Sequence, residues 1–154
     1  MAVTIRNAGQ ADWGQLWGLL QGMGTHEDEA TSQQTFGALV EDQRWLILVA
    51  EQAGAVVGYA AAQDYGPRLR ASVAGRFGRL HDVYVSQGCR RGGVGRSLML
   101  AVESWASSRV AYLHWQANQE RSAPFYEALG YRGDPCPQPD YPEFEVAFRS
   151  ASAS

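Results

Sequence analysis

The chain has 154 residues, 45% of them hydrophobic and 19% charged, with a formal net charge of −3 and a pI near 5.6. This length and apolar content predict one domain with a substantial core. The acidic balance argues against a nucleic-acid partner, because nucleic-acid-binding proteins usually present a basic surface. No apolar run approaches membrane-spanning length and there are only two cysteines, so we expect a cytoplasmic protein with no membrane partner and no disulfide framework.

Hydrophobic periodicity predicts the elements of the first half of the chain. The segment His26-Glu-Asp-Glu29, an acidic cluster, is expected in a loop, and so is the segment 65–78, which carries one proline, three arginines and three glycines. The predicted elements are, in order, a strand at 3–6, a helix capped by Asp12 and ended by Gly22-Met23-Gly24, a helix at about 32–41, and strands at 45–51 and 55–64 joined by a hairpin at 52–54.

The central stretch, from Leu80 to Ala106, predicts a strand that ends at Val85, a glycine-rich turn and an amphipathic helix. Glycines lack a β-carbon, so the backbone can turn sharply there and present its N–H groups. The start of a helix adds partial positive charge, and arginines bring forked donors that suit phosphate oxygens. These features predict a phosphate-binding turn, whose residues are Arg90, Arg91, Gly92, Gly93, Gly95 and Arg96.

The last third of the chain begins with a predicted strand at 111–117. A short helix follows, with Ser122 at its N-cap, Pro124 in its first turn and Gly130 as its stop. Four prolines between Asp134 and Pro142 predict irregular structure.

The chain is expected to end with a strand at 143–149 and a frayed tail at 150–154. The central strand–helix–strand unit requires one parallel pair, whereas the hairpin and the remaining strands favour antiparallel pairing. The predicted fold class is therefore α/β (α+β), with a mixed, mostly antiparallel central sheet flanked by helices.

Two motifs in order carry a resemblance to the GNAT superfamily of N-acetyltransferases, and it covers nearly the whole chain. The turn R90-R-G-G-V-G95 fits the pattern Q/R-x-x-G-x-G/A that follows the fourth strand in that family. The preceding strand LHDVYV and the later segment RSAPFYEALGY also resemble it. The resemblance implies a single domain at 1–149, with its parallel strand pair at the cofactor cleft. Other glycine-rich signatures fail, since no G-x-x-x-x-G-K-S/T and no G-x-G-x-x-G in register occur.

The resemblance implies acetyl-CoA as the acetyl donor. In the family, the glycine-rich turn and helix start hold the pyrophosphate, and the end of the preceding strand pairs with the pantetheine arm and the acetyl carbonyl. Asn118 resembles a pantetheine-contacting asparagine, although it precedes Tyr126 by eight positions, one more than the family spacing. The cofactor-binding residues implied are Val83, Tyr84, Val85, Arg90, Arg91, Gly92, Gly93, Val94, Gly95, Arg96, Ser97, Asn118 and Tyr126.

Two side chains are candidates for the chemistry. Tyr126 occupies the family position of the tyrosine that gives a proton to the departing CoA thiolate; the alternative is a helix tyrosine that packs on the sheet. His81 is the candidate base for the amine, at a position where spermidine/spermine-type relatives carry a glutamate. Strict alternation would place His81 on one face with Val83 and Val85, and Asp82 on the other. The alternative for His81 is a half-buried strand histidine bonded to its neighbours.

The sequence leaves the acceptor open: an aminoglycoside, a polyamine, an amino acid or a peptide amine. His26 and His114 have no companion ligands at metal spacing, so no metal is predicted. Exposed tryptophans such as Trp13 or Trp17 would support a homodimer, but core packing is their expected use. Two other functions compete with acetyl transfer: a catalytically silent GNAT-like module that binds acyl-CoA and acts through a protein partner, and a protein-interaction domain whose turn binds no anion.

Overall fold

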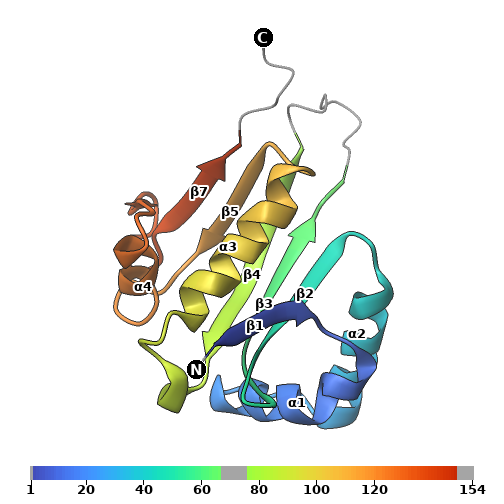
Figure 1. Ribbon diagram of the computed structural model, residues 1–154. Coiled ribbons are helices and arrows are strands. Elements are labelled where there is room, and N and C mark those ends of the chain that lie inside the picture. The colour runs from blue at the N-terminus through green and yellow to red at the C-terminus, as the bar shows by residue number, and fades with distance from the viewer. Residues whose placement is uncertain (1, 67–75, 149–154) are drawn as a thin grey trace. The chain divides into compact units, whose positions relative to one another are not determined.

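The computed structural model describes residues 2–66 and 76–148 (Figure 1). The order of elements follows the sequence prediction, with an added two-residue strand, β6. The expected tail at 150–154 and most of the expected loop at 65–78 lie outside the described residues. The strands and helices are β1 (Val3–Asn7), α1 (Trp13–Gly22), α2 (Glu29–Glu41), β2 (Trp45–Gln52), β3 (Ala55–Asp64), β4 (Phe77–Val85), α3 (Val94–Ser107), β5 (Tyr112–Gln116), α4 (Ala123–Ala128), β6 (Gly133–Asp134) and β7 (Glu143–Ala147).

The strands form one seven-stranded sheet in the order β1-β2-β3-β4-β5-β7-β6. Residues Phe77–Arg79 of β4 pair in parallel with Tyr112–His114 of β5. The pairs β1–β2, β2–β3, β5–β7 and β6–β7 are antiparallel. This arrangement confirms the predicted mixed, mostly antiparallel sheet with a parallel strand pair, although β4 begins at Phe77 and not at Leu80.

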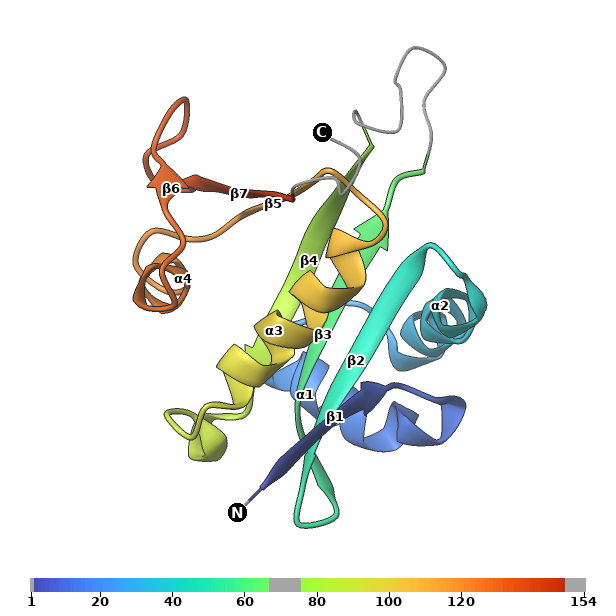
Figure 2. The same ribbon diagram turned by 45° about the horizontal axis from the view of Figure 1, so that its top comes forward.

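The contacts group the chain into two compact units, whose boundaries fall within β3 after Gln63, within β4 after Leu80 and within α3 after Trp105. The first unit contains the described residues up to Gln63 together with His81–Trp105. The second unit contains the described parts of Asp64–Leu80 and of the chain from Ala106 onward. Figure 2 shows the same elements from a second direction.

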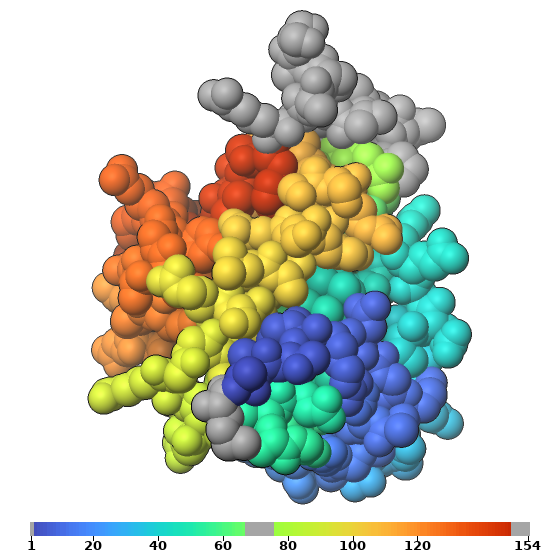
Figure 3. All heavy atoms as spheres, viewed as in Figure 1, coloured from blue at the N-terminus to red at the C-terminus, as the bar shows by residue number. Residues whose placement is uncertain are grey.

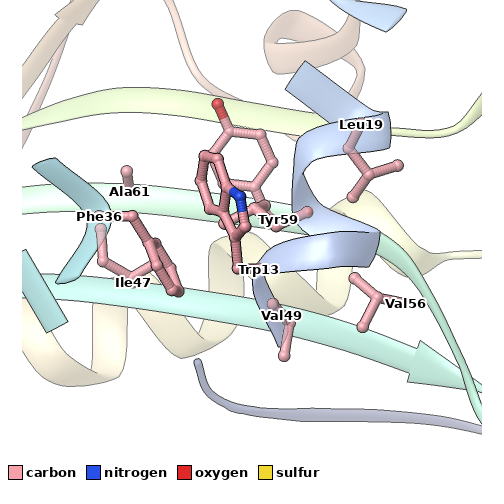
Figure 4. Packing of buried hydrophobic residues seen from close by; sticks show 9 residues of the cluster. Trp13, Leu19, Phe36, Ile47, Val49, Val56, Tyr59 and Ala61 are labelled. Atoms are coloured by element: carbon pink, nitrogen blue, oxygen red, sulfur yellow. The ribbon is translucent and has the colours of Figure 1, made fainter. Parts of the chain in front are cut away.

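The core of the first unit lies between the sheet and the helices α1 and α2 (Figure 4). Alternate residues of β2 and β3 point into it, and their register places Ile47 opposite Ala61 and Val49 opposite Tyr59. Trp13 is 5% exposed and stacks on Trp17 with ring centroids 5.6 Å apart. The tryptophans of α1 therefore serve the core, as the sequence analysis expected. The cluster consists of Trp13, Leu16, Leu19, Phe36, Ile47, Val49, Val56, Tyr59 and Ala61.

The caps of α1 and α2 differ from the sequence prediction. Asp12 holds the N-cap position of α1 but makes no side-chain cap bond to that helix. Its carboxylate instead accepts from the Gly9 N–H at 2.7 Å and from both terminal nitrogens of Arg6 at 2.8 and 2.9 Å. Helix α2 begins at Glu29, earlier than predicted, because Asp28 caps it by accepting from the backbone of Ala30 and Thr31. Part of the acidic run expected in a loop is thus a helix start.

The core of the second unit is aromatic. Trp115 of β5 stacks on Phe144 of β7 with centroids 5.6 Å apart, and Tyr126 of α4 lies 5.2 Å from the Trp115 ring. Helix α4 ends as predicted, with Gly130 in the left-handed region at φ +99°. Ser122 stands at its N-cap but makes no side-chain cap bond.

A partly buried ion pair joins the two chain segments that flank residues 67–75. Asp64 is 2% exposed and its Oδ2 lies 2.8 Å from an Arg76 terminal nitrogen. The other carboxylate oxygen accepts from the Gly66 N–H at 2.7 Å. Both oxygens of the buried carboxylate therefore have donors, as a buried charge requires. Among residues 2–66 and 76–148, no helix is long and apolar enough to cross a membrane.

Candidate active site

The glycine-rich turn follows β4 and leads into α3. A short 3₁₀ turn at Gln87–Cys89 comes first, and two residues then adopt the left-handed region: Arg91 at φ +71° and Gly93 at φ +84°. Residues 90–93 are exposed, and the turn, yellow-green in Figure 3, lies on the molecular surface. Left-handed residues interspersed with ordinary ones form concave arrays of N–H groups that bind anions.

The start of helix α3 adds further backbone donors next to this turn. Its first intrahelical hydrogen bond runs from the Ser97 N–H to the Gly93 carbonyl at 3.0 Å. The amides of Val94, Gly95 and Arg96 precede that bond, and such amides at a helix start are donors for an anion. Val94 and Gly95 are buried, so the helix start is fixed against the sheet while Arg96 is exposed. The turn therefore offers backbone donors on a rigid support.

The arginines of the turn play different parts. Arg90 folds back on β4: its Nε donates to the Val85 carbonyl at 2.9 Å, and its guanidinium carbon lies 5.4 Å from the centre of the Tyr84 ring. This contact ties the turn to the strand end through the Nε of Arg90, and the terminal nitrogens of an arginine form a fork that suits phosphate oxygens. Arg91 and Arg96 are exposed. In the sequence the three arginines are equivalent charges, and no pattern there indicates the contact between Arg90 and Val85.

The end of β4 lies very close to β3. A β-carbon placed on Gly58 would stand 2.9 Å from the Tyr84 carbonyl oxygen and 3.4 Å from side-chain carbons of Val94 and Leu98. The Ser86 N–H donates to the Val57 carbonyl at 2.9 Å. Val83, Tyr84 and Val85 are half-buried at this strand end. Glycine at position 58 therefore allows β3, β4 and the start of α3 to pack together.

His81 is exposed and held by two neighbours on one face of the sheet. Its ring stacks on Trp45 of β2 with centroids 4.7 Å apart and planes 14° from parallel. Its Nε2 lies 3.0 Å from Oε1 of Gln63. In the neutral tautomer that donates from Nε2 to Gln63, the ring carries its lone pair on Nδ1. The surroundings fix the orientation of a titratable group on this face.

Asp82 shares this face with His81, in contrast to the alternation assumed from sequence. His81 contacts Trp45 and Gln63, which lie opposite each other on β2 and β3 and so share one face of the sheet. Trp45 and Tyr84 both pack against the core under α1 and α2. The Asp82 carboxylate interacts with the Tyr59 hydroxyl, which lies in that same core. Residues 81, 82 and 84 therefore all face α1 and α2. Two neighbours on one face interrupt the two-residue alternation, as an inserted residue in a strand does.

Tyr59 is a buried phenol between a carboxylate and a thioether. It is 4% exposed, and its hydroxyl lies 3.2 Å from Sδ of Met23 at the end of α1. Burial, with a contribution from the Asp82 carboxylate, raises the pKa of Tyr59. Tyr59 therefore stays protonated and can donate a hydrogen bond.

Asn118 and Tyr126 lie in the second unit. The Asn118 side-chain oxygen accepts from the backbone N–H groups of Glu120 and Arg121, each at 3.0 Å, so it caps the turn before α4. Its amide nitrogen takes no part in these two bonds, because it can only donate a hydrogen bond. Tyr126 is 6% exposed and packs against Trp115, Phe125 and Phe144. Among the described residues, no three His, Cys, Asp or Glu side chains form a group that could hold a metal ion.

The sequence matches the acetyltransferase (GNAT) family over residues 13–131, which is most of the chain. The chain belongs to this family. None of the curated proteins compared with it gives a significant match.

Solved structures of GNAT-type enzymes share the fold along nearly the whole chain. The ribosomal-protein-S18-alanine N-acetyltransferase from Escherichia coli is 19% identical, with a TM-score of 0.71 and coverage of 99% of this chain and 98% of that one. The PaiA N-acetyltransferase from Thermoplasma acidophilum, solved with coenzyme A, is 14% identical, with a TM-score of 0.71 and coverage of 96% and 100%. An aminoglycoside 6′-N-acetyltransferase from Acinetobacter baumannii is 18% identical, with a TM-score of 0.73 and coverage of 85% and 91%.

In this GNAT chain, the structure gathers the candidate site residues into two groups. The turn residues 90–97, the strand end 83–85 and His81 lie in the first unit, whereas Asn118 and Tyr126 lie in the second. Sequence reasoning missed Asp82 and Tyr59 as members of the face that carries His81. Asp82 was visible beside His81, but alternation assigned it to the opposite face.

Proposed function

We propose that this protein transfers an acetyl group from acetyl-CoA to an amine by direct attack of the amine nitrogen on the thioester. The observation that supports this most strongly is the turn itself. Two left-handed residues, the first amides of α3 and three arginines lie on one segment in a chain of the GNAT family. These donors fit a pyrophosphate, since an anion at a helix start is stabilised by both the amides and the helix dipole.

We assign residues 90–97 to the pyrophosphate and Val83–Val85 to the pantetheine arm and the acetyl carbonyl. A backbone N–H of that strand end would stabilise the oxygen that becomes negative during attack, a contribution of about 3 kcal/mol in comparable sites. Asn118, through its amide nitrogen, is assigned to the pantetheine arm. In these assignments, backbone N–H groups make most of the contacts with acetyl-CoA. Glycine suits this role because it has no side chain to keep a ligand away from the backbone.

The proposed transfer needs one base and one acid. The acceptor must lose a proton to become a neutral amine, which costs roughly 4–5 kcal/mol at neutral pH for an ammonium of ordinary pKa. We assign that proton to the neutral imidazole of His81, directly or through water. The amine nitrogen then bonds to the carbonyl carbon as the carbon–sulfur bond breaks, and Tyr126 gives its phenolic proton to the departing thiolate. The nitrogen loses its second proton to water as the amide forms, and a proton from water restores the Tyr126 phenol.

The acceptor class is proposed as a primary amine of a small molecule or of a peptide. The structural neighbours include enzymes named for a ribosomal-protein alanine and for aminoglycosides. Their identity with this chain is below a quarter, so they support the reaction type and leave the choice of amine to experiment.

Thermal unfolding with and without acetyl-CoA tests the first step. A ligand at about a hundred times its dissociation constant should add about 2.7 kcal/mol to the free energy of unfolding. Release of free thiol from acetyl-CoA over pooled amines tests the transfer. The absence of a thermal shift at saturating acetyl-CoA would overturn the proposal.

Substitutions separate the two chemical roles. Tyr126→Phe should lower kcat by about a hundredfold and leave the affinity for acetyl-CoA unchanged, because only proton donation is lost. His81→Gln should lower kcat/KM most at pH values where the imidazole is neutral and the acceptor ammonium is still protonated, and least at low pH, where the imidazole is protonated and cannot act as a base. Phe125→Leu is the matched control for Tyr126, since Phe125 is the neighbouring ring on α4. A Tyr126→Phe enzyme with full turnover would remove Tyr126 from the mechanism.

A further inference from the structure

The rings of Trp45 and His81 meet across β3. Trp45 begins β2 and His81 lies in β4, and β3 stands between these two strands in the sheet. Neighbouring strands lie about 4.8 Å apart, so the two side chains must span β3 to stack with ring centroids 4.7 Å apart. Gln63 of β3 lies opposite Trp45 in the strand register. The three side chains therefore form one group across three strands, all within the first unit.

Gln63 holds the imidazole of His81 by a ring nitrogen. The Gln63 Oε1 lies 3.0 Å from the His81 Nε2, and an amide oxygen can only accept, so Nε2 carries the hydrogen in this contact. That hydrogen is present both in the neutral imidazole with Nε2–H and in the imidazolium. The bond to Gln63 therefore persists while the imidazole gains a proton at Nδ1 and loses it again. A base held in this way keeps its orientation throughout a proton transfer.

Trp45 supports the same imidazole from its face, with the two ring planes 14° from parallel. The Trp45 side chain also packs against the core of the first unit, and its backbone N–H donates to the Asp42 carbonyl at 3.0 Å. The indole is therefore anchored on its own strand. Because an aromatic face attracts a cation, the indole favours the imidazolium, which is the form that His81 reaches after it takes a proton.

We propose that Gln63 and Trp45 are positioning residues that hold the His81 imidazole in the orientation in which it takes the proton of the acceptor amine. This inference rests on the proposed function, because His81 is assigned there as the base. The step that they support moves one proton from the acceptor ammonium to the neutral imidazole, and the imidazolium then returns a proton to water. Gln63 and Trp45 act through His81 and exchange no proton themselves.

Proton NMR of the full-length protein tests the positioning without requiring turnover. The chain has three histidines, so the His81 ring signals are those lost in His81→Gln. The carbon-bound protons of a ring held flat against an indole should be shifted upfield. Trp45→Leu should abolish this shift, and Gln63→Leu should reduce it although the indole remains, because the imidazole is no longer held. Gln34→Leu, at an exposed glutamine of α2, should leave the shift unchanged.

Two NMR results would overturn the positioning: a His81 ring without an upfield shift in the wild type, or the full wild-type shift in Gln63→Leu. Thermal unfolding of each variant reports whether it folds. Gln63→Glu keeps an accepting oxygen and Trp45→Phe keeps an aromatic face, so both variants should retain the shift and provide a second pair in case a leucine variant is unfolded.

Steady-state kinetics, with an amine found by the thiol-release assay, tests whether the positioning serves catalysis. Gln63→Leu and Trp45→Leu should each lower kcat/KM for the amine by about tenfold, because a misplaced base transfers the proton less efficiently. The calorimetric affinity for coenzyme A should not change. Gln63→Glu and Trp45→Phe should recover most of the lost rate.

The decisive comparison uses the His81→Gln background. A residue that acts only through His81 has nothing left to position there, so Gln63→Leu should cause no further loss of kcat/KM. An undiminished tenfold loss in that background would overturn the proposal, because Gln63 would then affect the rate independently of His81. Full turnover by His81→Gln would overturn both the assigned base and this proposal. Failure of acetyl-CoA to bind would contradict the proposed function alone, since the NMR result does not depend on the cofactor.

Discussion

The glycine-rich turn and the face of β4 lie next to each other in the sequence, yet they are built in different ways. The turn draws its donors from backbone conformation, with Arg91 and Gly93 in the left-handed region and the amides of α3 behind them. The β4 face depends on side-chain direction, since His81 and Asp82 both point toward α1 and α2. A site built from backbone can be recognised locally, whereas one built from side chains depends on the register of a whole strand.

Gly58 connects the two regions. Its position lies against the carbonyl of Tyr84 on β4 and against Val94 at the start of α3. A change at this residue should therefore disturb both regions, whereas changes within either one should be separable.

The largest expected effect follows from Gly58→Ala. The new β-carbon would stand 2.9 Å from a backbone oxygen that cannot move alone, so β4 or α3 must shift. We expect the free energy of unfolding to fall by about 2–3 kcal/mol, measured by urea denaturation. Gly18→Ala is the matched control, because nothing lies within 4 Å of its β-carbon and alanine favours the helix interior. Equal stability of Gly58→Ala and the wild type would refute the close approach.

Gly93→Ala should disturb the turn alone. The φ of +84° is strained for alanine, at a cost of about 1–2 kcal/mol, although no atom lies within 4 Å of the new β-carbon. We expect about tenfold weaker binding of coenzyme A by calorimetry, with no change of charge. Gly88→Ala, which has equal space and an ordinary φ, should bind normally. Similar affinities of Gly93→Ala and Gly88→Ala for coenzyme A would mean that the left-handed conformation at Gly93 does not contribute to coenzyme A binding.

Arg91→Gly separates charge from conformation within the turn. Glycine accepts the φ of +71° without strain, so stability should rise by up to about 1 kcal/mol while one charged donor is lost. Binding of coenzyme A should weaken by about fivefold, with a shallower dependence on salt concentration. An unchanged affinity would remove Arg91 from the phosphate site and leave the backbone as its main component.

The smallest effect should come from Asp12, which lies outside both regions. Hydrogen bonds from Arg6 lower the pKa of Asp12, so the ionised form stabilises the fold above about pH 4, and this contribution is lost as the pH falls through the lowered value. Asp12→Asn should lower the free energy of unfolding by about 1 kcal/mol at neutral pH. Below pH 4, the stability of this variant should decline less steeply than that of the wild type. Affinity for coenzyme A should not change, which provides a baseline for the other variants.

The element order and the turn were predictable because their signals are local. Periodicity located the strands and helices, glycines and arginines located the turn, and Gly130 located the end of α4. The cap of α2 was also within reach, since Asp28 precedes the helix in an ordinary capping pattern.

Three features could not be predicted from the sequence, for physical reasons. The shared face of His81 and Asp82 arises from an interruption of alternation, which a two-residue period cannot reveal. The contact of Arg90 with Val85 needs a side chain to fold back along the chain. The bonds of Asp12 to Arg6 and Gly9 show that a residue at a cap position can satisfy a different partner.

The tight packing at Gly58 has a consequence for how this protein can diversify. In a combinatorial library that randomises positions 58, 81 and 82 under selection for acetylation of new amines, the two β4 positions can change with the shape and charge of each amine. Position 58 should return glycine in every selected clone, because it sets the spacing that all of those clones share.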